Sequence, residues 1–109
     1  MKRIEAFIKP FTVEEVKQAL YDAGVPTVRI GEVKELTRSN TYAEVYRGVE
    51  YEVDVVPRAS IVVHVEDGDV DRVAAVIANA ARTESRGDGV ITVSPIEAVM
   101  NLDTEEISS

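Results

Sequence analysis

Apolar and polar residues alternate over residues 1–9, which predicts a β-strand with one buried face. From Thr12 onward the apolar residues recur every three or four positions, which predicts a helix. Thr12 and Glu15 have the spacing of a capping box at the start of this helix, and Gly24 is a stop signal at its end. The buried stripe of the helix would consist of Val13, Val16, Leu20 and Ala23.

The same two patterns follow a second time. Strands are predicted over residues 27–36, with a bulge or strong twist at Gly31, and over residues 59–66. The acidic residues 66–71 lack the glycine and glutamate that a calcium loop needs, and they suit the N-terminus of a helix that runs to about Arg82. The buried stripe of this helix would consist of Val70, Val73, Ala74, Ile77 and Ala81.

The remaining segments complete the fold. Residues 83–89 predict a tight turn and residues 90–94 a fourth core strand, while residues 95–100 suit a short helical turn and residues 101–109 a polar tail. Strand–helix–strand therefore occurs twice, which predicts one α+β domain over residues 1–109 with the ferredoxin-like βαββαβ order.

Two helices can cover only one face of a four-stranded antiparallel sheet. The other face would carry a mixture that is more apolar than a solvated surface, namely Phe7, Val62, His64, Val90 and Thr92. We therefore expect a homo-oligomer in which this face meets another subunit. A mixed face in contact with solvent is the alternative.

Residues 36–58 form an unusually long connection, since compact domains rarely use connections above about 15 residues without a functional reason. Tyr42, Tyr46 and Tyr51 alternate here with charged residues. This composition suits a mobile arm with aromatic anchors for a partner protein. A long twisted β-ribbon that packs only on its own domain accounts for the same residues equally well.

The composition excludes several classes of function. The chain has 20 acidic and 12 basic residues and a formal charge of −8, which argues against binding to nucleic acid or to an anionic membrane. It has no cysteine and no long apolar run, so we expect no disulfide and no membrane insertion, and a cytoplasmic location. His64 is the single histidine, which makes a transition-metal site improbable, and no nucleophile–base pair is apparent.

The turn at residues 86–89 reads Arg-Gly-Asp-Gly. Its glycines allow close backbone approach to a phosphate or another small anion, although a plain turn explains them as well.

Five motifs, spread over nearly the whole chain, carry a family resemblance. They are MKRIEAFIKPF at residues 1–11, EVK at 32–34, YRGVEY at 46–51, VDVVPR at 53–58 and ARTESRGDG at 81–89. In this order they resemble the PII signal-transduction family.

This resemblance implies a trimer of ferredoxin-like subunits with ATP or ADP in the clefts between subunits, often together with 2-oxoglutarate and magnesium. Residues 37–57 would be the T-loop, which contacts partners such as ammonium channels and enzymes of nitrogen metabolism. Tyr51 matches the tyrosine that some members have uridylylated.

The chain departs from the family pattern around the phosphates. Where the pattern has a glutamine, a lysine and two arginines, this chain has Ser39, Val90, Asn101 and Asp103. The loop base, G-F-G-R-Q in the pattern, reads E-L-T-R-S at residues 35–39. Of the usual basic ligands, Arg38 and Arg58 (for a lysine) remain.

Three further arginines, Arg29, Arg82 and Arg86, could compensate from new positions, or they could be ordinary surface charges. A ligand with less charge than ATP, such as ADP, AMP or bicarbonate, would need fewer cations. The predicted ligand-binding residues are Arg29, Arg38, Arg58, Val62, His64, Thr83, Arg86, Gly87, Asp88 and Gly89.

The sequence therefore favours a trimeric, non-catalytic regulator that senses a small metabolite. Its arm would contact a transporter or metabolic enzyme through Tyr46, Arg47 and Tyr51. The alternative is a constitutive binding module that has lost ligand sensing. An enzyme on the same fold is the least supported interpretation.

We predict weak ATP binding. A charge-assisted hydrogen bond contributes about 1.5–3 kcal/mol, so the loss of three cations lowers affinity for a triphosphate about 10³-fold or more. Isothermal titration should detect no micromolar ATP binding. Micromolar affinity that 2-oxoglutarate and magnesium enhance would contradict this prediction.

Overall fold

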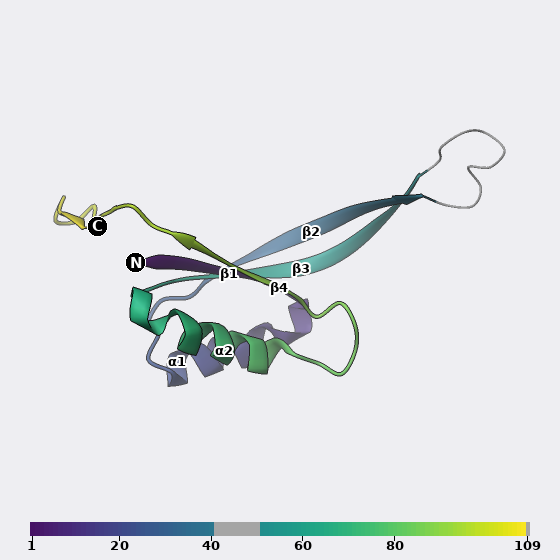
Figure 1. Ribbon diagram of the computed structural model, residues 1–109, viewed down its shortest axis with the longest axis horizontal. Helices are drawn as coiled ribbons and strands as arrows, with labels where there is room; N and C mark the ends of the chain where they lie inside the picture. Colours follow the sequence, from purple (N-terminus) through teal and green to yellow (C-terminus); the bar gives the residue numbers. More distant parts are fainter. Residues whose placement is uncertain (41–50, 109) are drawn as a thin grey trace.

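The two strand–helix–strand patterns fold into a four-stranded antiparallel sheet with two helices packed on one face (Figure 1). The computed structural model describes residues 1–40 and 51–108. Its main elements are β1 (Lys2–Ile8), α1 (Val13–Asp22), β2 (Arg29–Asn40), β3 (Tyr51–Val65), α2 (Val70–Ala81) and β4 (Gly89–Pro95). The strand order is β2-β3-β1-β4, so the predicted α+β, ferredoxin-like βαββαβ fold is confirmed.

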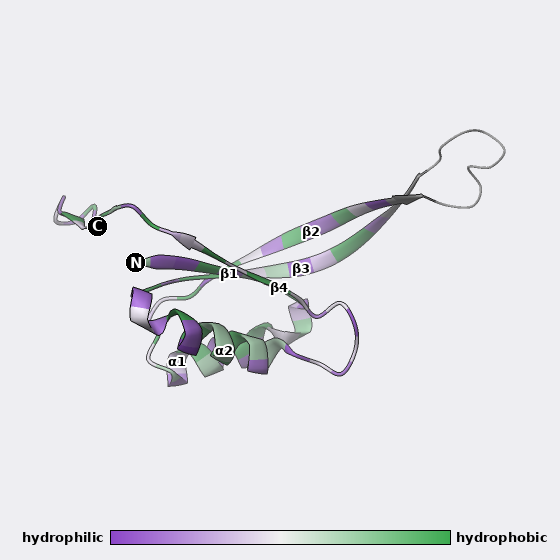
Figure 2. Cartoon of the chain, viewed as in Figure 1, coloured by the Kyte–Doolittle hydropathy of each residue, from purple (hydrophilic) through white to green (hydrophobic). Residues whose placement is uncertain are grey.

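The core lies between the helices and the sheet. Alternate residues of β1 and β3 point toward the helices, and both predicted helix stripes supply residues that pack against them. The largest fully buried side chains are Ile4, Ile8, Val16, Leu20, Ile61, Val63, Val73 and Ile77. Figure 2 shows that α2 is mostly apolar, whereas the turn that follows it is polar. Among the described residues, no helix is long and apolar enough to cross a bilayer.

The two ends of α1 differ in how well the sequence predicts them. The predicted capping box at Thr12 is wrong, because the Thr12 hydroxyl donates to the carbonyl oxygen of Lys9 at 2.7 Å. A 3-10 turn over Pro10–Thr12 precedes α1 and turns this hydroxyl away from the helix. The predicted stop at Gly24 is confirmed, since Gly24 has a φ of 88° and the Val25 amide donates to Leu20 O at 3.0 Å.

β2 and β3 are longer than the sequence pattern predicts. They pair without interruption from Arg29 opposite Val62 to Asn40 opposite Tyr51, so the expected bulge at Gly31 is absent from this ladder. We call the outer part of the two strands, residues 33–40 and 51–58, the ribbon, and Figure 1 shows it extending beyond the helices. The predicted partner residues Tyr46 and Arg47 lie outside the described residues, as does Tyr42, while Tyr51 begins β3.

The C-terminal segment forms a small hairpin. Residues 95–100, expected as a helical turn, instead contain β5 (Val99–Met100), which pairs with β6 (Ile107–Ser108) inside the expected polar tail. The Asn101 side chain closes the turn by accepting the Asp103 amide at 2.9 Å.

The sheet face opposite the helices, called the open face below, carries the residues that the alternation predicts. Glu5 pairs with Val62 and Thr92, Phe7 pairs with Val90, and Arg3 pairs with His64. Directly paired residues point to the same side of a sheet, so the five predicted residues share this face. No described helix of the chain covers it.

Gly89 sets how closely β4 approaches β1. It has a φ of 129°, and a Cβ at this position would lie 1.8 Å from the carbonyl oxygen of Phe7. A residue with a side chain would therefore have to separate the two strands.

We predict that Gly89→Ala lowers the free energy of unfolding by about 3 kcal/mol or more, because it combines backbone strain with a clash against the β1 backbone. Gly68→Ala is the control, since a Cβ at Gly68 meets nothing within 4 Å. Urea unfolding of both variants is the measurement. Equal stability of the two variants would contradict the prediction.

Candidate functional site

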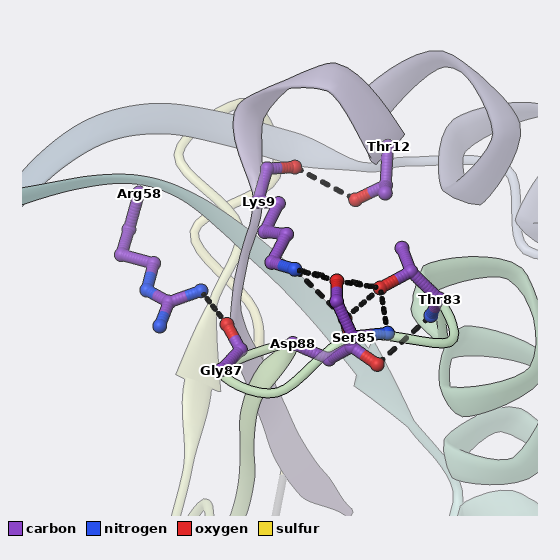
Figure 3. A network of polar contacts seen from close by, with 7 residues as sticks. All are labelled: Lys9, Thr12, Arg58, Thr83, Ser85, Gly87 and Asp88. Carbon is purple, nitrogen blue, oxygen red and sulfur yellow. Dashed lines mark hydrogen bonds and ion pairs between the residues drawn. The ribbon is translucent and has the colours of Figure 1, made fainter.

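Three segments that are distant in the sequence meet where β2 and β3 extend past the end of β1. Ile8, the last residue of β1, pairs with Ala59 on one side and with Gly89 on the other. This register places Lys9 and Arg58 beside the turn of residues 82–88, which joins α2 to β4 (Figure 3). We call this arrangement the corner.

Arg58 connects the three segments of the corner. Its side chain is 9% exposed, and its Nε donates to Glu35 Oε1 at 2.8 Å. Its Nη1 donates to the carbonyl oxygen of Gly87 at 2.6 Å (Figure 3). One guanidinium group therefore joins β2 and β3 to the turn, and its charge is balanced by a carboxylate of the same chain.

Asp88 holds the turn in shape. The amide of Thr83 donates to Asp88 Oδ2 at 2.8 Å, and the Thr83 hydroxyl donates to Oδ1. Lys9 Nζ lies 3.3 Å from the same Oδ1 and donates to Ser85 Oγ at 2.7 Å. The Thr83 hydroxyl, the Thr83 amide and Lys9 hold the pKa of Asp88 below its usual value of 3.8, so the carboxylate is ionised at neutral pH.

Two hollows lie near the corner. One of about 250 Å³ lies beside the turn and is lined in part by Arg82, Asp88, Gly89 and Val90. Another of about 910 Å³ lies between the start of α1 and the facing parts of β2 and β3, and its lining combines apolar residues with the charged residues Glu32, Lys34 and Arg58. The larger hollow is lined by Arg58 and the smaller by Asp88 and Gly89, so both border predicted ligand residues of the candidate site.

The structure divides the predicted ligand-binding residues into two groups. Thr83, Gly87, Asp88 and Gly89 lie in or next to the turn at the corner, together with Arg58. Arg29, Val62 and His64 lie instead on the open face. Because strands rise about 3.3 Å per residue, Val62 lies about 13 Å along β3 from Arg58. Within one chain the two groups do not form a single site.

The other predicted cations lie in the turn or farther out along the ribbon. Arg38 is in β2, opposite Val53 and farther out along the ribbon than Glu35. Arg86 lies in the turn, Arg82 lies at the end of α2, and both are exposed. The compensation expected of Arg29, Arg82 and Arg86 therefore stays a prediction.

Sequence reasoning missed two residues of the corner, Lys9 and Glu35. Both act through partners that only the strand register reveals, since Lys9 pairs with an acid 79 positions away and Glu35 with a base 23 positions away. A sequence signal existed for Glu35, which stands in the loop-base motif where the family pattern begins with glycine.

The open face carries its own electrostatic feature. Arg3 Nη1 donates to Glu5 Oε1 at 2.9 Å, and Ser60 Oγ donates to Glu5 Oε2 at 2.9 Å. His64 lies near Arg3 and Arg29 on the same face. Partial desolvation of the ring and these two guanidinium groups hold the pKa of His64 below its ordinary value of 6.5.

Comparisons with known proteins agree with the fold. A family model described as "Nitrogen regulatory protein P-II" matches residues 1–106. A nitrogen regulatory protein P-II from Azospirillum brasilense is 44% identical over 106 residues, which cover 97% of this chain and 95% of that protein. Those from Rhodobacter capsulatus and Cereibacter sphaeroides are 45% and 43% identical over the same shares.

The lowered pKa of His64 predicts a pH effect on stability. Below about pH 6.5 the unfolded chain binds a proton at His64 that the folded chain resists, so stability falls as the pH drops through this range. Urea midpoints measured at about pH 7.5 and 5.5 should therefore fall more for the wild type than for His64→Gln. A parallel pH dependence of the two proteins would show that His64 does not cause the effect.

Proposed function

The chain belongs to the nitrogen regulatory protein P-II family, and from this premise we propose that it is a cytoplasmic signal-transduction protein that senses a small metabolite and regulates a partner protein. Proteins of this family are regulators rather than enzymes, and they act as trimers. The arm, residues 37–57, is the element that would carry the signal to the partner.

One observation carries this proposal. Arg58 joins the foot of the ribbon to the turn of residues 82–88, through Glu35 on one side and Gly87 on the other. A ligand that binds at the turn therefore changes the contacts that hold the base of the arm. This is the physical link that a sensor needs between a ligand site and an output element.

The separation of the ligand residues into two groups supports a site between subunits. In a trimer that buries the open face, the corner of one subunit would lie beside Arg29, Val62 and His64 of its neighbour. Each subunit would then contribute its corner to the site shared with one neighbour and its open-face residues to the site shared with the other. This arrangement also accounts for the apolar residues of the open face, such as Phe7 and Val90.

The charges of the corner favour a ligand with little negative charge. Lys9 and Arg58 are the cations that bond to the turn from the end of β1 and from β3, and each is already paired with a carboxylate of the chain, Asp88 and Glu35. ADP, AMP or bicarbonate would bind here more readily than ATP, because each added phosphate needs a further cation.

The output side of the proposal rests on the arm. Tyr46 and Arg47 are the contact residues that we assign to a transporter or metabolic enzyme, because an aromatic ring and a guanidinium supply much of the binding energy in interfaces. Tyr51 is a third contact and a candidate for covalent modification.

A second candidate is a constitutive binding module that keeps the fold and the arm but no longer senses a ligand. The internal pairing of Lys9 with Asp88 and of Arg58 with Glu35 favours it, because both pairs complete the corner without a ligand.

A thermal-shift screen tests the sensor. A ligand that binds only the native state at about 100 times its Kd adds about 2.7 kcal/mol of stability. We expect ADP, AMP or bicarbonate to raise the melting temperature, and Arg58→Gln to remove the shift. Arg72→Gln is the control, since Arg72 bonds Ala23 O on the helical layer and lies outside the corner. No shift with any ligand would contradict the sensor.

Limited proteolysis separates the two candidates. In a sensor, a ligand that gives a thermal shift should also change the cleavage rate within residues 37–57, because binding alters the base of the arm. A constitutive module should give the same cleavage pattern with every ligand.

A further inference from the structure

We propose that Glu35 determines which ligands the corner accepts, because its carboxylate occupies the guanidinium of Arg58 in place of an anionic group of the ligand. This inference rests on the proposed function and names the residue that regulates the same site. Glu35 thus acts as a specificity-determining residue whose displacement accompanies anion binding.

The geometry makes Glu35 a direct competitor of an anionic ligand. Arg58 stands opposite Val33 and Glu35 stands two residues farther along β2, so the two charged side chains are diagonal neighbours on one face of the ribbon. Glu35 Oε1 lies 2.8 Å from Arg58 Nε, which is the distance of a charge-assisted hydrogen bond to a carboxylate or phosphate. The same guanidinium donates to Gly87 O in the turn, so an anion bound at Gly87 would lie beside this cation.

The burial of the pair strengthens the competition. Arg58 is 9% exposed and Glu35 is 36% exposed, so the cation is held inside while the carboxylate remains able to move toward solvent. An incoming phosphate meets the negative charge of Glu35 unless this side chain leaves. The penalty grows with the charge of the ligand, which ranks AMP above ADP and ADP above ATP.

The position of Glu35 links its displacement to the arm. β2 continues from Glu35 into the arm and ends at Asn40. While Glu35 holds Arg58, the two strands of the ribbon are fixed to the turn at this point. When an anion takes its place, the ribbon keeps its backbone ladder, but β2 loses its side-chain link to Arg58 and through it to the turn.

The test is a titration of three proteins with AMP, ADP and ATP at constant ionic strength. Glu35→Gln removes the charge and keeps the shape of the side chain. Glu32→Gln is the matched control, because it makes the same charge change on the same strand, three residues earlier and on the opposite face. Arg58→Gln in the Glu35→Gln background tests whether any gain passes through Arg58.

The expected result is that Glu35→Gln binds ADP at least tenfold more tightly than Glu32→Gln, with a larger gain for ATP than for AMP. Without ligand, Glu35→Gln should melt at a lower temperature than the wild type, because a buried cation loses its partner. A purely structural role for Glu35 predicts that stability and ligand affinity fall together. The double variant should lose the gain.

The outcomes separate this inference from the proposed function. If the wild type binds ADP and the two glutamine variants bind it equally, the role of Glu35 is overturned and the sensor stands. If only Glu35→Gln binds nucleotide, the role of Glu35 is supported and the wild-type sensor for nucleotides is overturned. If no protein binds any of the three nucleotides, both are overturned for nucleotides.

Discussion

The arrangement of the whole site depends on the pairing of β1 with two neighbours. β1 is central, and Ile8 at its end pairs with both Ala59 and Gly89. This register alone brings Arg58, at the inner end of the ribbon, next to the turn that follows α2. It requires a backbone at Gly89 that only glycine can supply, because a Cβ there would collide with the β1 carbonyl of Phe7. The close contact between two strand backbones is therefore the constraint that positions Arg58, Lys9 and Asp88.

Sequence patterns predicted the parts of the fold that have one buried face. The strands under the helices and both helix stripes could be read from periodicity, because burial imposes the period. The ribbon could not be predicted from periodicity. The helices do not cover it, so neither of its faces needs to be apolar. Leu36 is 65% exposed and Val55 is 55% exposed there. The backbone ladder continues past the point where the pattern stops, so both strand boundaries were predicted too short. The capping box failed because of a local competitor, since the 3-10 turn over Pro10–Thr12 brings the Lys9 carbonyl oxygen within hydrogen-bond distance of the Thr12 hydroxyl.

The residues of the candidate site could be predicted from the sequence, but the ion pairs that they form could not. The Gly-Asp-Gly turn and Arg58 could be identified from motifs, and the structure brings them together. That Arg58 and Lys9 are already neutralised could not be read from the sequence, because Glu35 and Asp88 reach them across strands and through a turn. Counting cations in the sequence therefore overstates the positive charge available to a ligand. Val90, which replaces the lysine of the family pattern, acts in the same direction, because it lines the smaller hollow beside the turn without a charge.

A corner in which Lys9 and Arg58 are both paired without a ligand changes how binding and output would be coupled. In a site whose cations are unpaired before binding, an anionic ligand forms new contacts, and its binding energy is large. Where each cation already has a partner, the ligand gains only the difference between its own contacts and those it replaces. The affinity is lower, but every binding event must break an internal contact at the base of the ribbon. Couplings between sites are typically about 1–3 kcal/mol, which is the size of one charge-assisted hydrogen bond. A single exchange at Arg58 is thus enough to connect the turn to the arm, and tight binding is not required for that connection.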